Sequence, residues 1–284
     1  MFYLVDKPLG VSSNLVAKIL KRVLRVSKIG FAGTLDPLAT WLMIIWTDGS
    51  SRLFPLIEHH TKTYLTTIRL DGTSSSYDQE QPIESVEVSE DVKNNLTKDF
   101  IAWIIHENFL GDIMQIPPTY SATWIDGQRA YELARKGHDI EIKAKKRTVH
   151  AFEIVSYEWP RLVAKISVSH GTYIRSLARD LWVKLQTGWY LESLRRSEIG
   201  HLTLENHSWI QHNDIIYTPI KHTEIFPEIP LIDLPEEQKK HLRLGSTPLK
   251  TERKNGYYFV HYENTSYGLL ESREGALFPI KNEV

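Results

Sequence analysis

The stretch Lys28-Ile29-Gly30-Phe31-Ala32-Gly33-Thr34-Leu35-Asp36-Pro37-Leu38-Ala39-Thr40 organises the rest of the chain. Gly30, Gly33 and Pro37 interrupt it, so we expect it to form neither a helix nor a strand. Its single carboxylate, Asp36, lies among apolar residues, where an ionised group is costly without a cation nearby. Taken alone, an Asp that precedes Pro is most often a solvated turn residue.

Regular structure is predicted on both sides of this stretch. Ser12 or Ser13 can cap a helix whose apolar residues recur at helical spacing. Residues 42–46 are a candidate buried strand, and residues 61–70 alternate with β-branched side chains as a half-buried strand does. Further helices are expected over 97–108 and 172–185. We therefore expect an α/β (α+β) fold with a mixed, largely antiparallel sheet.

The remaining segments predict the domain organisation. Asp71 to Gln81 is polar and is expected to be a loop. The pattern weakens from Asn206 to Pro230, whereas the last 54 residues contain three short β runs. We expect a large domain over 1–205, a linker over 206–230 and a small β domain over 231–284.

Composition excludes several classes of protein. No apolar run approaches the roughly 20 residues of a membrane-spanning helix, and the first residues do not resemble a secretory signal. Cysteine is absent and the twelve histidines show no metal-ligand spacing, so we predict no disulfide and no metal. These features are typical of a cytoplasmic enzyme.

The charge distribution is uneven although the net charge is only -1. Residues 1–52 carry seven Lys or Arg against three Asp or Glu (+4), and residues 129–200 carry fourteen against eight (+6). Residues 71–112 carry two against ten (-8). Such segments can fold into a basic face that binds nucleic acid, or into ordinary solvated faces, and charge alone does not separate these two interpretations.

Six short motifs occur in order along the first 200 residues. Residues 33–40 read Gly-Thr-Leu-Asp-Pro-Leu-Ala-Thr, and the others lie at 4–13, 62–64, 115–122, 171–181 and 193–196. Together they resemble the TruB family of tRNA pseudouridine synthases. The C-terminal segment is only loosely similar to the small RNA-binding PUA-type domain that ends many members.

The resemblance implies the pseudouridine synthase fold, with a catalytic cleft in the domain over 1–205, and it implies an activity. Members convert one uridine in the T loop of tRNA, position 55, to pseudouridine, which requires the uridine to leave the stack and enter a pocket. The implied partner is the T arm of tRNA, the implied state is a monomer, and no cofactor is needed because the reaction is redox-neutral.

The resemblance also implies residue roles. Asp36 is the nucleophile or general base, Arg175 the cation that pairs with it, and Tyr64 the aromatic that stacks on the uracil. Whether Asp36 attacks the base, attacks the sugar or removes a ribose proton stays open at this point. The implied substrate-binding residues are Tyr173, Leu194, Phe31, Lys7, Tyr120 and Asp180. Weaker candidates for phosphate contacts are Lys7, Lys18, Arg22, Lys143, Lys145, Lys146 and Arg147.

Two alternatives remain open. The chain could be a catalytically weak tRNA-binding or RNA-folding module that uses the same cleft. It could also be an enzyme that acts on another RNA within a guide complex. The presence of Asp36, Tyr64 and Arg175 together argues against the first, because binding alone does not need a buried carboxylate near phosphates.

The chain departs from the family pattern at two kinds of position. Phe31 stands where members usually have His, which preserves stacking but removes a hydrogen-bonding role. Tryptophan occupies four positions at which glycine is expected, Trp41, Trp46, Trp182 and Trp189. Our hypothesis is that the source organism reads UGA as glycine and that these residues are glycines in the native protein.

Overall fold

The computed structural model describes residues 1–121, 123–125, 127–137, 140–205, 207–244, 248–261 and 267–281. Ala122 of the fourth motif and Asn206, at which the linker is expected to begin, lie outside the described residues. No helix within these ranges is both long and apolar enough to cross a membrane. The helices are α1 (Ser13–Val23), η1 (3₁₀, Asp48–Leu53), α2 (Phe54–Glu58), α3 (Glu90–Asn95), α4 (Lys98–Phe109), α5 (Ala130–Arg135), α6 (Ile174–Leu185), α7 (His222–Ile225) and α8 (Glu236–Arg243).

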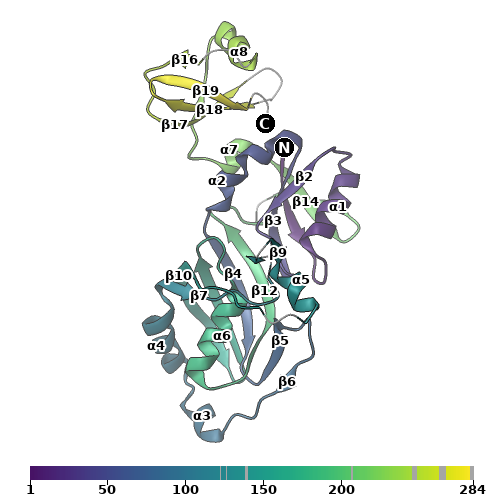
Figure 1. Cartoon of the computed structure of the whole chain (residues 1–284), viewed down its shortest axis with the longest axis vertical. Coiled ribbons are helices and arrows are strands. Elements are labelled where there is room, and N and C mark those ends of the chain that lie inside the picture. The colour runs from purple at the N-terminus through teal and green to yellow at the C-terminus, as the bar shows by residue number, and fades with distance from the viewer. Residues whose placement is uncertain are drawn as a thin grey trace.

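Twelve strands of the described chain form one large sheet, most of it in the order β13-β14-β1-β3-β12-β4-β11-β10-β7 (Figure 1). Within the described part of this sheet only the pairs β12–β3 and β12–β5 are parallel, so the expected mixed, largely antiparallel sheet is confirmed. The strands are β1 (Phe2–Lys7), β2 (Ile29–Ala32), β3 (Ala39–Thr47), β4 (Lys62–Arg69), β5 (Gly72–Asp78), β6 (Glu84–Ser85), β7 (Gly111–Gln115), β10 (Lys145–Glu158), β11 (Arg161–Val168), β12 (Trp189–Ile199), β13 (Ile210–His212) and β14 (Ile215–Ile220). A separate hairpin joins β8 (Trp124–Ile125) to β9 (Gln128–Arg129).

The central strands are buried on both faces. Successive side chains of a strand point to opposite sides, so Tyr3 and Val5 of β1 join one core while Phe2 and Leu4 join the other. Helices α1, α4 and α6 cover the first core with their apolar faces. Helices α2 and α7 cover the second through Ile57 and Ile225. Figure 1 shows α4 and α6 lying against the sheet.

Two segments that the sequence predicts to be irregular are strands. Ile29–Ala32 forms β2, which pairs with β3 and places Gly30 opposite Trp46. A Cβ atom at Gly30 would lie 2.6 Å from the Trp46 ring, so glycine is used here for close approach rather than to break the strand. The expected polar loop over 71–81 contains β5, which pairs with β6 and β12. Its polarity misled the prediction because Ser74 and Ser76 bond within the segment itself.

The segment predicted as a linker contributes to the large sheet. β14 pairs antiparallel with β1 from Ile216 to Ile220, so only residues after 220 connect the two sheets. Beyond it, a second sheet has the order β15-β17-β18-β19-β16 and lies at one end of the molecule (Figure 1). Its strands are β15 (Leu231–Ile232), β16 (Leu249–Lys250), β17 (Gly256–His261), β18 (Tyr267–Arg273) and β19 (Ala276–Lys281). Phe259 of β17 packs against Phe226 and His222, which joins this sheet to the second core.

Candidate active site

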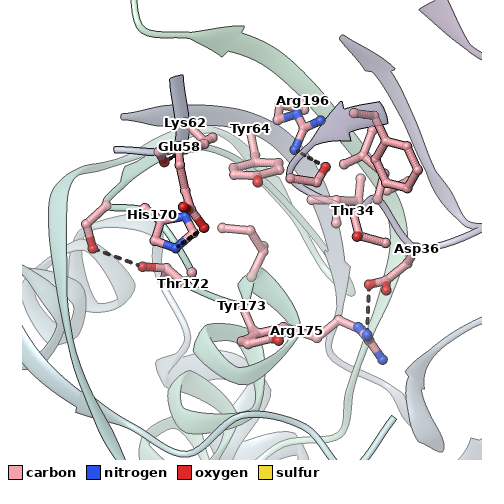
Figure 2. A pocket seen from close by; sticks show the side chains of 18 of the residues that line it. Thr34, Asp36, Glu58, Lys62, Tyr64, His170, Thr172, Tyr173, Arg175 and Arg196 are labelled. Atoms are coloured by element: carbon pink, nitrogen blue, oxygen red, sulfur yellow. Dashed lines mark hydrogen bonds and ion pairs between the residues drawn. The ribbon is translucent and has the colours of Figure 1, made fainter. Parts of the chain in front are cut away.

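A cavity of about 430 Å³ lies where the Asp36 loop meets β4, β12 and the start of α6. Six residues predicted for the site line it together: Phe31, Asp36, Tyr64, Tyr173, Leu194 and Arg175. They come from four separate segments of the chain, around residues 31–36, 64, 173–175 and 194. Figure 2 shows Asp36 and Arg175 on one side of the cavity and Glu58 and His170 on the other, with Tyr64 and Tyr173 between them.

The loop that carries Asp36 is held at several points along its length. The Ser13 hydroxyl donates to the Leu35 carbonyl and accepts from the Leu35 N–H, both at 2.9 Å. Arg196 donates through Nε to the Leu42 carbonyl (2.8 Å) and through Nη1 to the Gly33 carbonyl (3.0 Å). These bonds span both ends of the loop, so the Asp36 backbone is positioned before any substrate arrives.

Asp36 forms an ion pair with Arg175, whose Nη2 lies 2.8 Å from Asp36 Oδ2. Arg175 is 4% exposed, whereas 35% of the Asp36 side chain faces the cavity. Burial raises the pKa of the Asp36 carboxyl, Arg175 opposes this increase, and the charge of Asp78 adds to it. The site therefore keeps a carboxylate at the cavity wall whose protonation depends on its two charged neighbours.

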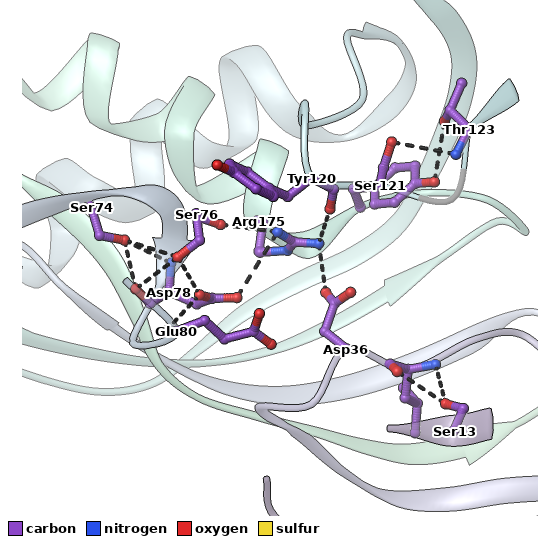
Figure 3. Close-up of polar contacts among 12 residues, drawn as sticks. Ser13, Asp36, Ser74, Ser76, Asp78, Glu80, Tyr120, Ser121, Thr123 and Arg175 are labelled. Atoms are coloured by element: carbon purple, nitrogen blue, oxygen red, sulfur yellow. Dashed lines mark hydrogen bonds and ion pairs between the residues drawn. The ribbon is translucent and has the colours of Figure 1, made fainter. Parts of the chain in front are cut away.

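Asp78 is a buried carboxylate that sequence reasoning missed (Figure 3). Its Oδ2 lies 3.9 Å from Arg175 Nη1, and its Oδ1 accepts from the Ser76 hydroxyl (2.6 Å) and from the Glu80 N–H (3.0 Å). Arg175 also donates to the Ser76 and Tyr120 carbonyls, both at 2.9 Å. The guanidinium is thus fixed from several directions. An acidic residue inside a serine-rich segment offered no local signal for this role.

Tyr64 and Arg196 form a cross-strand pair on β4 and β12. Tyr64 is 9% exposed and Arg196 is 1% exposed, and both line the cavity. Burial lowers the pKa of Arg196, and the adjacent Tyr64 phenol acts in the opposite direction. Arg196 belongs to the motif at 193–196, and no role for it was evident from the sequence. The structure shows that it holds the Asp36 loop beside the Tyr64 ring.

Tyr173 precedes α6 and is held by the fourth motif. Gln115 accepts from the Tyr173 N–H (2.8 Å) and donates to the Tyr173 carbonyl (3.1 Å). The Tyr173 hydroxyl lies 3.3 Å from Thr123 Oγ1. The Gln115 side chain therefore fixes the backbone of Tyr173, from which the Tyr173 side chain reaches the cavity.

Three residues predicted to bind substrate do not line the cavity. Lys7 is completely buried, and its Nζ donates to the carbonyls of Pro8, Val11 and Pro37. A phosphate cannot reach it, so this prediction is wrong in its proposed form. Asp180 pairs with its neighbour Arg179 at 2.8 Å on α6, and Tyr120 contributes its carbonyl to Arg175. Burial lowers the pKa of Lys7 to about 8, and Asp36 acts in the opposite direction.

The candidate phosphate contacts are spread over two surfaces. Lys18 and Arg22 are exposed on α1, and Lys145 and Lys146 are exposed on β10, while Lys143 is exposed just before β10. Lys146 pairs with Asp112 at 2.8 Å, and Arg147 donates to the Gly171 carbonyl at 2.8 Å. Among the described residues, no group of three or more acidic or histidine side chains is arranged to hold a metal ion.

The four tryptophans at expected glycine positions have different environments. Trp41 has a φ of +82°, in the left-handed region that favours glycine, and the Arg195 guanidinium carbon lies 3.8 Å from its ring centroid. Trp46, Trp182 and Trp189 have no positive φ. Trp189 is 2% exposed and packs on Tyr77, with ring centroids 4.6 Å apart. Only at Trp41 does the backbone itself call for glycine.

Comparison with known protein families shows which family the chain belongs to. The model of the TruB family pseudouridylate synthase N-terminal domain matches residues 21–174, or 154 of the 284 residues. The chain belongs to the TruB family. It is 40% identical over 207 residues to tRNA pseudouridine synthase B of Phocaeicola vulgatus, covering 71% of this chain and 86% of that protein. It is 35% identical over 258 residues to tRNA pseudouridine synthase B of Corynebacterium glutamicum, covering 85% and 82%.

Solved structures share the fold of this TruB family member. An H/ACA ribonucleoprotein bound to a substrate RNA containing 2′-deoxyuridine matches with a TM-score of 0.65 and 18% identity, covering 98% of this chain and 84% of that chain. A Cbf5-Nop10-Gar1 complex matches with a TM-score of 0.62 and 19% identity, covering 98% and 83%. The expected pseudouridine synthase fold is therefore confirmed.

Proposed function

We propose that the protein isomerises the uridine at position 55, in the T loop of tRNA, to pseudouridine. The observation that carries this proposal is the Asp36–Arg175 ion pair at the wall of a cavity that Tyr64 also lines. Membership of the TruB family, and relatives named tRNA pseudouridine synthase B, support the reaction and the substrate class.

The reaction exchanges one glycosidic bond for another. The bond from C1′ to N1 of the uracil breaks, the base turns, and a bond from C1′ to C5 forms. C5 loses its proton and N1 gains one, so no redox partner and no cofactor are required. Asp36 acts as nucleophile or general base in this sequence, and Arg175 keeps its carboxylate charged at the time of reaction.

The other cavity residues receive the flipped base. Tyr64 provides an aromatic face for the uracil, and base–aromatic stacking contributes about 1–3 kcal/mol. Tyr173, Leu194 and Phe31 also line the cavity. The exposed basic residues of α1 and β10 provide the charge that attracts the RNA backbone.

The remaining expectations form part of the same proposal. We place the catalytic domain at 1–205 together with β14, and a PUA-like RNA-binding domain at 231–284. The protein acts in the cytoplasm as a monomer on the T arm of free tRNA. The relatives' names favour this over a guide complex, because the likeness to H/ACA structures extends only to the fold.

The alternative is an RNA-binding module without catalysis. It would have to retain a buried Arg175 and Asp78 beside Asp36, although charges buried in this way are expensive and add nothing to phosphate binding. In a catalytic site, these charges set the position and the protonation of Asp36.

The deciding experiment is carbodiimide mapping of an unmodified tRNA transcript after incubation with the protein or with Asp36→Asn. We expect a reverse-transcription stop at position 55 with the wild type and none with the variant. Intact tRNA binding without modification by the wild-type chain would favour the binding module. A stop at another uridine would reject the T-loop assignment.

A further inference from the structure

The cavity has a second side that the proposed reaction does not use. Glu58 and His170 line it, away from Asp36 and Arg175 (Figure 2). Glu58 Oε1 lies 3.3 Å from His170 Nε2, and both side chains are partly exposed, at 35% and 42%. A substrate larger than one base would meet this pair.

Both residues stand on backbone that is held in place. Glu58 is the last residue of α2, and its carbonyl accepts from Lys62 Nζ at 2.5 Å. Lys62 is 5% exposed, so its ammonium serves this contact rather than solvent. His170 precedes Gly171, whose carbonyl accepts from Arg147 Nε at 2.8 Å. The pair is therefore pre-organised, as a recognition site requires.

The charge of the pair decides what it can bind. Burial lowers the pKa of His170, and Lys62, Arg147 and His59 act in the same direction, while Glu58 opposes them. These groups come from β4, β10 and the end of α2, the elements that surround the imidazole. The lowered pKa favours the uncharged imidazole, so the Glu58 carboxylate is the hydrogen-bond acceptor that the pair offers to a substrate.

A carboxylate inside an RNA-binding cavity accepts hydrogen bonds from base edges. The exocyclic amino group of cytosine or adenine, or the amino and imino groups of guanine, can donate to it. Uracil has no amino group, and its single N3–H lies between two carbonyl oxygens, which repel a carboxylate. The arrangement thus distinguishes amino-bearing bases from uracil.

We propose that Glu58, positioned by His170, reads an amino-bearing nucleobase adjacent to the target uridine. This inference rests on the proposed function and assigns the second side of its cavity. Glu58 contacts the neighbouring base, and His170 acts as a positioning residue through its bond to Glu58.

The test uses T-arm stem-loop RNAs in which the base on each side of the target is C, A, G or U. Single-turnover rates are followed by tritium released from C5 of the labelled target uridine. At one of the two positions, the wild type should prefer amino-bearing bases over U by about fivefold or more. Glu58→Gln, which has the same shape but adds a donor, should abolish most of that preference.

Matched variants separate recognition from general damage. Glu198→Gln changes a carboxylate of similar exposure that pairs with Lys165 outside the cavity, and it should keep the preference. His170→Gln retains an N–H donor and should keep more of the preference than His170→Leu. The ratio of wild-type to variant rates on each RNA cancels the effect that a base change has on the loop itself.

The outcomes are distinct. Equal wild-type rates for all flanking bases, or a Glu58→Gln variant that slows every RNA by the same factor, would overturn this inference while leaving the proposed function standing. A wild-type protein that modifies no T-arm RNA and no tRNA would remove the proposed function and this inference with it.

Discussion

Arg175 Nη2 lies 2.8 Å from Asp36 Oδ2 and ties α6 to the loop between β2 and β3. The same guanidinium faces Asp78 on its other side at 3.9 Å. Arg175 and Asp78 therefore act on the Asp36 pKa in opposite directions, the first lowering it and the second raising it. This relationship gives two predictions of opposite sign.

Arg175→Lys should move the acidic limb of the kcat/KM profile to higher pH. A lysine cannot donate to the Ser76 and Tyr120 carbonyls and pair with Asp36 at once, so the Asp36 pKa rises further. We expect activity at neutral pH to fall by about 10²-fold. Tritium release between pH 5 and pH 9 measures the change, and an acidic limb that does not move would contradict it.

Asp78→Asn should move the same limb to lower pH. The variant removes the charge that raises the Asp36 pKa but retains an amide oxygen near Ser76 and Glu80. Activity at neutral pH should fall less than in Arg175→Lys, because Arg175 still pairs with Asp36. A shift of the limb in the same direction for both variants would reject this electrostatic account.

Asp36→Asn should increase the free energy of unfolding at neutral pH while abolishing activity. Folding raises the Asp36 pKa, so the unfolded chain releases this proton first as the pH rises above about 3.9. Wild-type stability is therefore lost between that value and the folded pKa, and the asparagine variant avoids the loss. Urea unfolding at pH 7 and below pH 4 tests this. The free energies of unfolding of the wild type and the variant should agree only at the lower pH.

Lys7→Met should reduce kcat without changing the salt dependence of tRNA binding. Lys7 is buried and holds the Pro37 carbonyl next to Asp36, so its loss displaces the loop rather than a phosphate contact. Lys145→Met serves as the comparison. If the exposed Lys145 contacts a phosphate, its loss should reduce the slope of log affinity against log salt concentration by about one. A reduced slope in Lys7→Met would restore the phosphate-contact prediction.

Trp41→Gly should be more stable than Trp41→Ala by about 1–2 kcal/mol. A φ of +82° costs an L-residue about that much and costs glycine almost nothing. Comparing two small residues separates this backbone effect from the loss of ring contacts. At Thr40, which has no positive φ, alanine should instead be more stable than glycine. If the glycine variant were the more stable at both positions, or the alanine variant at both, the left-handed backbone at Trp41 would not explain the result.

The same residue bears on the UGA hypothesis. If the source organism reads UGA as glycine, peptides of the native protein should carry glycine at 41, 182 and 189. Peptide mass spectrometry of the protein from its natural source tests this directly. UGG codons at these positions would end the hypothesis.

Local pattern predicted much of the fold. The helix capped by Ser12 occurs where the apolar spacing placed it, and the helix expected over 97–108 is α4. The alternation over 61–70 predicted β4. These predictions succeed because capping and the periodic burial of one face act over a few residues. The motifs around Asp36, Tyr64 and Arg175 were also readable in order, so the family was identifiable before the structure.

Tertiary structure alone decided which polar groups are buried together. Asp78 lies in a segment whose composition indicated a loop, and Lys7 looked like a surface lysine, yet both are buried. β14 joins β1 across more than 200 residues, which no local pattern encodes. Glu58 and His170 meet for the same reason. A side chain's charge and hydrogen-bonding capacity are written in the sequence, but the partners that satisfy or perturb them come from distant segments that only folding brings within contact.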